Sequence, residues 1–257
     1  MNSTIAALVR RHDPDRFLTA LFAPAEKRDA LLTLYAFNHE LARAREAVSE
    51  PGLALIRLQW WREVVEGAAR RHEVAEPLTV AMDSGDLDRA DLLALIDARE
   101  IEAEPEIENL QSWQGYLLSN AGGLAVAAGR LLAAPEPEAL RTSGAGYGAA
   151  GLLRSVAAHA RQGRCLLPAD LLAEQRLTPE QVIAAPMAAP VQAVVRQLAN
   201  DWLGRLDHPV RLPRHAIAAA LPVVLARRDL RRAPLFPAER GLGDRLAVIT
   251  AGLAGRT

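Results

Sequence analysis

Apolar residues recur along most of this chain at steps of three and four, which is the spacing of one face of an α-helix. The clearest case is residues 26–48, where the apolar stripe comprises Leu31, Leu34, Phe37, Leu41 and Val48. Pro51-Gly52 then predicts a break, and a second stripe follows with Leu55, Leu58, Trp61 and Val65. Alternation of the kind that β-strands show is nearly absent, so the pattern predicts an all-α fold.

Several short motifs predict where helices begin. Asp13-Pro14 is an N-cap followed by proline at the first helical position, and Thr178-Pro179-Glu180-Gln181 is a capping box. Further helices are expected over about 88–104, 111–134, 136–161, 190–206, 213–228 and 243–253. We therefore expect an antiparallel helical bundle of roughly ten elements. No linker-like segment divides the chain, so residues 1–257 are expected to form a single domain.

The expected helix over 136–161 contains four glycines, namely Gly144, Gly146, Gly148 and Gly151. Glycine costs about 1 kcal/mol relative to alanine inside a helix, so such a cluster needs a compensating reason. The spacing predicts a helix wall that another helix or a ligand approaches closely. No strand precedes these glycines, so they are not a dinucleotide-binding motif.

Composition narrows the class of protein. The net charge of the chain is -1, which argues against a general nucleic-acid binder, and we expect no nucleic-acid partner. Cys165 is the only cysteine, so no disulfide can form within the chain. The start of the chain lacks the features of a secretory signal, and the most apolar run, 216–226, is shorter than the roughly 20 residues of a membrane-spanning helix. We expect a cytoplasmic protein whose membrane contact, if any, is peripheral.

Two segments carry a resemblance to a known family. The first runs from Asp13-Pro14-Asp15-Arg16-Phe17 through Pro24 and Arg28 to Tyr35-Ala36-Phe37. The second is Leu153-Arg154-Ser155-Val156, followed by Gly163-Arg164 and Leu167-Pro168. Together with Tyr116 and Ala121-Gly122, they resemble the squalene/phytoene synthases, which join two prenyl diphosphates head to head. The resemblance implies an isoprenoid-synthase fold with a central cavity.

Both of the family's metal-binding clusters are degraded in this chain. Where the family has Asp-Asp-x-x-Asp, this sequence has Ala42-Arg43-Ala44-Arg45-Glu46, and only Glu46 is acidic. Where the family has Asp-x-x-x-Asp, it has Ser155-Val156-Ala157-Ala158-His159. Magnesium needs carboxylate oxygens, and losing the several kcal/mol that a metal ion supplies slows a reaction about tenfold for each 1.36 kcal/mol. We therefore expect no cofactor and no catalytic residue.

The degraded motifs are most similar to those of a non-catalytic branch of the family. Tyr35-Ala36-Phe37-Asn38-His39-Glu40-Leu41-Ala42-Arg43 and Gln59-Trp60-Trp61-Arg62 carry this likeness. The branch includes a mitochondrial assembly factor for respiratory complex I and its bacterial relatives. The resemblance implies a pseudoenzyme with an assembly or scaffolding role near the inner membrane, whose partners are respiratory-complex components and an isoprenoid or anionic lipid.

The resemblance also implies which residues surround the retained cavity, and we take these as candidate ligand-binding residues: Arg28, Tyr35, His39, Arg43, Glu46, Tyr116, Arg154, Ser155, His159 and Arg164. Arginine binds phosphate without a metal, because its planar guanidinium forms bidentate hydrogen bonds. The glycines Gly122, Gly123, Gly144, Gly148 and Gly151 are expected to line the space for a prenyl tail.

Other interpretations of the same residues remain open. Arg43 can instead pair with a neighbouring glutamate, and Arg154 can be half of a buried ion pair. Ser155 and His159 lie one helical turn apart, but no acid completes a catalytic triad, and His39, Glu46 and His159 make only a weak transition-metal set. The two alternatives are a divergent prenyltransferase that condenses prenyl diphosphates, with arginines in place of magnesium or with magnesium as its cofactor, and a helical interaction module with a filled cavity.

Overall fold

The computed structural model describes residues 3–46, 48, 50–104, 106–207, 211–237 and 239–257. Within these residues the chain forms α-helices and short 3-10 helices and no β-strand. The extended pairing found in the described part of the chain is one isolated bridge, between Ile107 and Pro168. The all-α prediction is confirmed.

The elements of the first half are α1 (Ser3–His12), α2 (Pro14–Ala20), α3 (Ala25–Glu46), α4 (Pro51–Glu66), α5 (Ala75–Asp83), α6 (Arg89–Asp97) and the 3-10 helix η1 (Glu100–Ala103). The middle of the chain forms α7 (Leu110–Ser119), α8 (Ala121–Leu131), η2 (Pro137–Leu140), α9 (Arg141–Arg154), α10 (Val156–Arg161), α11 (Ala169–Glu174) and α12 (Pro179–Ala184). The last elements are α13 (Ala189–Arg205), η3 (Arg214–Ala216), α14 (Ile217–Ala220), α15 (Pro222–Arg232) and α16 (Leu242–Ala254).

The predicted helix starts are confirmed by their capping bonds. The Asp13 carboxylate accepts a hydrogen bond of 3.0 Å from the backbone N–H of Arg16, and Pro14 is the first residue of α2. At α12 the Thr178 hydroxyl accepts from the Gln181 N–H at 3.4 Å, and the Gln181 side chain accepts from the Thr178 N–H at 2.9 Å. These bonds are local, which is why the sequence predicts them well.

The predicted helices 111–134, 136–161 and 213–228 are each divided, and these predictions were wrong in this respect, as was the one for 88–104, which is divided into α6 and η1. The first bends at Asn120, whose ψ is -83°, and the second at Ser155, whose ψ is 6°. In the third, Pro222 begins a new helix, α15. Apolar spacing continues through a bend of this kind, so periodicity alone merges the two parts. The first two bends contribute to the cavity described below, because Asn120 and Ser155 both line it.

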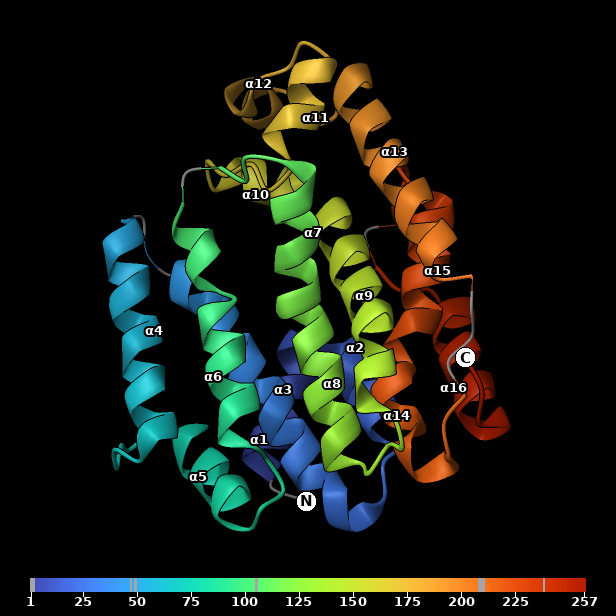
Figure 1. Cartoon of the computed structure of the whole chain (residues 1–257). Coiled ribbons are helices and arrows are strands. Elements are labelled where there is room, and N and C mark those ends of the chain that lie inside the picture. Colours follow the sequence, from blue (N-terminus) through green and yellow to red (C-terminus); the bar gives the residue numbers. More distant parts are fainter. Residues whose placement is uncertain (1–2, 47, 49, 105, 208–210, 238) are drawn as a thin grey trace.

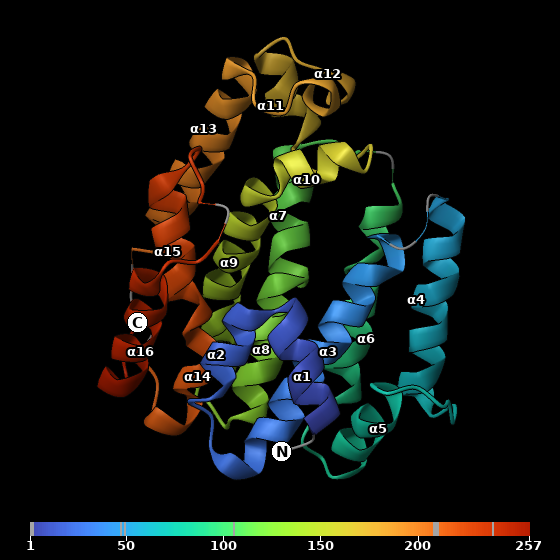
Figure 2. The same cartoon turned by 180° about the vertical axis from the view of Figure 1, so that it is seen from behind.

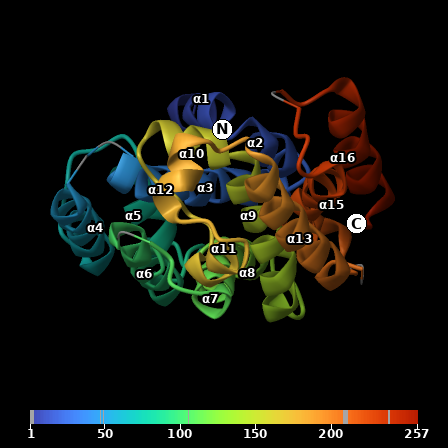
Figure 3. The same ribbon diagram turned by 90° about the horizontal axis from the view of Figure 1, so that it is seen from above.

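That cavity is lined by residues from α1, α2, α3 and α7 to α10. Figure 1 shows α4, α6, α7, α9 and α13 running roughly upright across the molecule, with α11 and α12 beyond one end. Seen from behind and from above, α1 and α2 cover one face, while α7 and α8 lie on the opposite side (Figures 2 and 3). One apolar core joins α1, α3 and α8 with α4–α6, and a second joins α7, α9 and α13.

The glycines of α9 serve mainly helix packing. A Cβ atom on Gly144 would lie 2.5 Å from the carbonyl oxygen of Ala121 in α8, and one on Gly148 would lie 2.6 Å from the Cβ of Ala121. Gly122 likewise faces the backbone of Arg141, at 2.7 Å. The prediction of a closely approached helix wall is confirmed, whereas the expectation that Gly122 and Gly144 line a tail-binding space was wrong, because neighbouring backbone occupies that space.

Candidate functional site: a polar cavity bounded by buried ion pairs

A cavity of about 680 Å³ opens between the start of α2, the C-terminal half of α3, α7 and the bend from α9 to α10. Charged side chains on its wall include Asp13, Asp15, Arg16, Glu46, Arg99, Arg154, Glu239 and Arg240. Its size is within the usual range of 300–1,000 Å³ for small-molecule sites, but most such sites are predominantly apolar. The cavity therefore suits a polar ligand or the polar end of a larger one.

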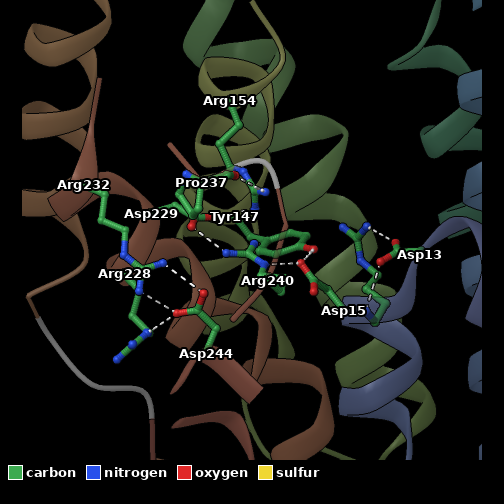
Figure 4. A network of polar contacts seen from close by, with 11 residues as sticks. Asp13, Asp15, Tyr147, Arg154, Arg228, Asp229, Arg232, Pro237, Arg240 and Asp244 are labelled. Carbon is green, nitrogen blue, oxygen red and sulfur yellow. Dashed lines mark hydrogen bonds and ion pairs between the residues drawn. The ribbon is translucent and has the colours of Figure 1, made fainter. Parts of the chain in front are cut away.

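One wall is a chain of ion pairs that joins α2, α9 and α15 (Figure 4). Arg240 lies between two carboxylates: its Nε is 2.9 Å from Asp15 Oδ2 and its Nη1 is 2.5 Å from Asp229 Oδ1. Arg154 donates to the other oxygen of Asp229 at 3.1 Å. Asp229 is only 1% exposed, so its charge needs both arginines as partners. These contacts hold Arg154 and Arg240 at the cavity wall.

Arg16 occupies the floor of the cavity. Its Nη1 is 2.8 Å from Asp13 Oδ2, and its guanidinium lies over the rings of Tyr147 and Tyr35, at 4.8 and 5.7 Å from the ring centroids. The hydroxyl of Tyr147 donates to Asp15 Oδ2 at 3.3 Å, which links the floor to the ion-pair wall. Burial raises the pKa of both tyrosines, so they are neutral hydrogen-bond donors at physiological pH.

A second polar cluster is centred on Glu102, which does not line the cavity itself but contacts the cavity-lining residues Arg99 and Tyr116. Its Oε1 accepts hydrogen bonds from Arg99 at 2.6 Å and from the Tyr116 hydroxyl at 2.5 Å, and Arg164 lies 3.7 Å from its Oε2. Asn120 donates to the Tyr116 oxygen at 3.0 Å. Burial alone would raise the pKa of Glu102, but the neighbouring arginines and the hydrogen bonds outweigh it and lower that pKa. Glu102 is therefore a buried carboxylate anion.

Five of the ten candidate residues predicted from the sequence line the cavity: Glu46, Tyr116, Arg154, Ser155 and His159. They come from α3, α7 and the bend between α9 and α10, so the tertiary fold brings together segments that are distant in the sequence. Arg154 combines both interpretations that the sequence left open, because it lies at the cavity and is also part of a buried ion pair. Ligand binding by these residues stays a prediction.

The other five candidates lie elsewhere. Arg28 donates to the carbonyl oxygens of Leu21 and Ala23, and Arg43 is an exposed partner of Glu40. His39 stacks on His12, with ring centroids 4.4 Å apart. Tyr35 is buried beneath Arg16, and Arg164, whose side chain is 9% exposed, lies beside Glu102. None of these five side chains lines this cavity, because four of them pack against other parts of the chain and Arg43 faces solvent beside Glu40 of its own helix, so their expected place on its wall was wrong.

Several cavity residues were missed by the sequence analysis, above all Asp15, Arg99, Tyr147 and Arg240. Asp15 and Arg16 belong to the first family-like segment, and that signal could have placed them at the site. Arg240 offers no such signal, because it lies 225 positions from its partner Asp15 and outside both family-like segments. Its role depends entirely on the fold.

The family to which the motifs point uses magnesium, and the residues present here do not fit that ion. Of the two degraded clusters, Glu46 is the one carboxylate, and burial followed by repulsion from Glu102 raises its pKa. Asp13 and Asp15, two of the other three acids that line the cavity, are bound by Arg16 and Arg240. In the described part of the chain, no group of three or more His, Cys, Asp and Glu side chains is arranged to hold a metal ion.

His159 is expected to make the stability of the protein depend on pH. Burial, and then the charge of Arg164, lower the pKa of His159 to about 4 from an ordinary value of 6.5. Because protonation is disfavoured in the folded state, stability should fall as the pH drops from above 6.5 toward 4. At pH 5 this one group is expected to make the protein about 2 kcal/mol less stable than at pH 8.

Urea unfolding of the wild type and of His159→Gln at pH 8 and pH 5 measures this effect. The variant should lose about 2 kcal/mol less than the wild type between the two pH values. His215→Gln, which alters an exposed histidine, is the matched control and should behave like the wild type. An equal loss in the wild type and His159→Gln would show that His159 does not carry the effect.

Comparison with solved structures identifies the fold. The structure superposes on that of a dehydrosqualene synthase in complex with ligand, with a TM-score of 0.76 and 14% identity, over 98% of this chain and 95% of the other. It also superposes on squalene synthase from Alicyclobacillus acidocaldarius, with a TM-score of 0.68 and 14% identity, over 89% of this chain and 90% of the other. At 14% sequence identity, these similarities show a shared fold.

The sequence profile of the squalene/phytoene synthases matches residues 9–237, and the chain belongs to this family. Among relatives, complex I assembly factor 6 of Mus musculus is 26% identical over 226 residues, which span 85% of this chain and 68% of the relative. The human protein of the same name is 24% identical over the same spans. The resemblance inferred from the motifs is thus confirmed, as is the similarity to complex I assembly factors.

Proposed function

We propose that this protein is a non-catalytic member of the squalene/phytoene synthase family that assists assembly of respiratory complex I. The observation that carries the proposal is that Glu46 is the one carboxylate left in the two degraded metal clusters, while the cavity acids Asp13 and Asp15 are paired with arginines. The similarity to complex I assembly factor 6 supports the assembly role. No cofactor is required in this proposal.

The place of action in this proposal is the cytoplasmic surface of the inner membrane. No described helix is both long enough and apolar enough to cross a bilayer. Contact with the membrane would then be peripheral, beside the nascent complex. The cavity would serve as a binding site for an anionic lipid or prenyl phosphate, held by arginines rather than by magnesium.

The assembly role is tested in the source organism. Deleting the gene should lower the NADH:quinone oxidoreductase activity of its membranes, and the wild-type gene should restore it. Affinity capture of the protein from the same membranes should recover complex I subunits, while a tag-only strain should not. Full complex I activity in the deletion strain would contradict the proposal.

Catalysis is expected to be absent. The purified protein, supplied with farnesyl or geranylgeranyl diphosphate and Mg²⁺, should release no pyrophosphate above background, because too few carboxylates remain to hold the ions. An active dehydrosqualene synthase in the same assay is the positive control. Magnesium-dependent product formation would favour the alternative of a divergent prenyltransferase.

Arg154 is expected to strengthen ligand binding. In calorimetric titration with farnesyl diphosphate in EDTA, Arg154→Ala should weaken binding by about 1.5–3 kcal/mol, the range for hydrogen bonds to charged groups. Arg228→Ala is the matched control, because Arg228 pairs with Asp244 at 2.6 Å and does not line the cavity. No binding to the wild type, or equal loss in both variants, would contradict an anion site at Arg154.

A further inference from the structure

The polar cavity does not continue into a space that could hold an apolar chain. Beneath the contact between Arg16 and Tyr147, the space lined by Leu124, Ala219 and Val223 has a volume of only about 10 Å³. A single water molecule needs at least about 10–15 Å³. The tail of an amphiphilic ligand therefore has no room in the interior of the bundle as it is packed here.

A second space of about 690 Å³ lies beside the polar cavity rather than beneath it. It is a groove between the bend from α9 to α10, helix α13, and the segment that follows α15. Its apolar wall includes Leu153, Val156, Val195, Pro234, Leu235 and Phe236. Leu235 and Met187, at 79% and 64% exposure, extend this apolar surface to the solvent.

The groove and the polar cavity share part of their lining. Arg154 and Glu239 line both spaces. Arg154 is fixed at this boundary, since it donates to Asp229 at 3.1 Å and to the Pro237 carbonyl at 3.5 Å (Figure 4). A molecule whose charged end lies beside Arg154 and Arg240 can thus place an attached chain in the groove without crossing the packed core.

One kind of ligand fits both spaces. Arginines slightly outnumber acids on the wall of the polar cavity, whereas in the groove Arg232 is already paired with Asp244 at 2.9 Å and most of the remaining wall is apolar. The groove volume of about 690 Å³ is within the usual range for sites that bind small molecules. An anionic head with one flexible apolar chain satisfies both surfaces.

We propose that the lateral groove binds the chain of a single-chain amphiphile whose phosphate or diphosphate head lies in the polar cavity. This inference rests on the proposed function for the head, but it adds a separate site for the chain. The chain contributes affinity by burying apolar surface against α9, α10, α13 and residues 233–237.

Photo-crosslinking locates the chain directly. The probe is a farnesyl diphosphate analogue with a diazirine at the end of its chain, bound to the intact protein in EDTA. The expected labelled peptides contain residues 187–195 or 233–237 of the groove. Labelling of Leu124, Ala219 or Val223 would place the chain inside the bundle and overturn the proposal.

Calorimetry with two ligands separates the head site from the chain site. Farnesyl diphosphate should bind the wild type at least about tenfold more tightly than inorganic pyrophosphate, because only the former has a chain to bury. Ala157→Trp, which fills the groove, should abolish that difference and leave pyrophosphate binding unchanged. Leu235→Glu should reduce the difference, whereas Leu253→Glu, a substitution of another exposed leucine, on α16, should not.

The outcomes distinguish the two proposals. Binding of pyrophosphate with no advantage for farnesyl diphosphate would overturn the groove and leave the head site intact. Binding and groove labelling by farnesyl diphosphate without pyrophosphate binding would support the groove and contradict the anion site. Failure of the wild type to bind either ligand would overturn both. The groove proposal would also be overturned if a captured protein partner shielded the groove from labelling and farnesyl diphosphate did not.

Discussion

Replacing Glu102 by alanine is expected to lower the free energy of unfolding by about 3–5 kcal/mol, the usual cost of breaking a buried ion pair from one side. Glu102 is 7% exposed and accepts hydrogen bonds from Arg99 and Tyr116, with Arg164 close by. Without its carboxylate, two largely buried guanidinium groups lose their counter-ion. Chemical denaturation at neutral pH measures the loss.

The matched control for this prediction lies two residues earlier in the same 3-10 helix. The Glu100 side chain is 53% exposed and pairs with Arg62 at the surface, so Glu100→Ala should cost at most about 1 kcal/mol. Glu102→Gln keeps hydrogen-bonding capacity but not the charge, and an intermediate loss is expected. Equal stabilities for the alanine variants at positions 100 and 102 would show that the buried cluster contributes little.

Two glycines of α9 are expected to respond to alanine with opposite signs. At Gly144, a Cβ would lie 2.5 Å from both the Ala121 carbonyl oxygen and the Ala125 Cβ, so α8 and α9 must separate. Such overpacking should cost about 3 kcal/mol. At Gly151 no heavy atom lies within 4 Å of the added Cβ, and alanine should stabilise the helix by up to about 1 kcal/mol.

The pair is best judged by the difference between the two variants, about 4 kcal/mol in the free energy of unfolding. Both substitutions add one methyl group to the same helix, so each is the control for the other. Similar small effects at both positions would mean that α8 and α9 are not packed as closely as the structure has them. Loss of ligand binding in Gly151→Ala would add that this position, which lines the cavity, contacts the ligand.

Features that depend on neighbouring residues were predictable. The apolar stripe of α3 and the caps at Asp13 and Thr178 each depend on residues that are no more than four positions apart. They can therefore be recognised in the sequence. The family-like segments around Arg154 and Tyr116 also identified residues that do line the cavity. Absence of the acidic clusters could be seen from the residues at 42–46 and 155–159.

Features that depend on the path of the chain were not predictable. Periodicity indicates which face of a helix is apolar, but it does not say whether a polar side chain on another face meets solvent, a neighbouring helix or a cavity. Arg43 and Arg154 illustrate this point, since one is exposed beside Glu40 and the other reaches Asp229 across 75 positions. The bends at Asn120 and Ser155 were likewise hidden by continuous apolar spacing.

The sequence by itself therefore determined the helical class, the family and the loss of the magnesium ligands, because these follow from residue types and local spacing. The tertiary structure decided how the remaining charges are used. Only the fold brings Arg240 to Asp15 over a separation of 225 positions and closes the space below Tyr147. Burial makes these pairings necessary, because a charged side chain that has lost its water is stable only beside an opposite charge or a hydrogen-bond partner. The fold determines which partner is within reach.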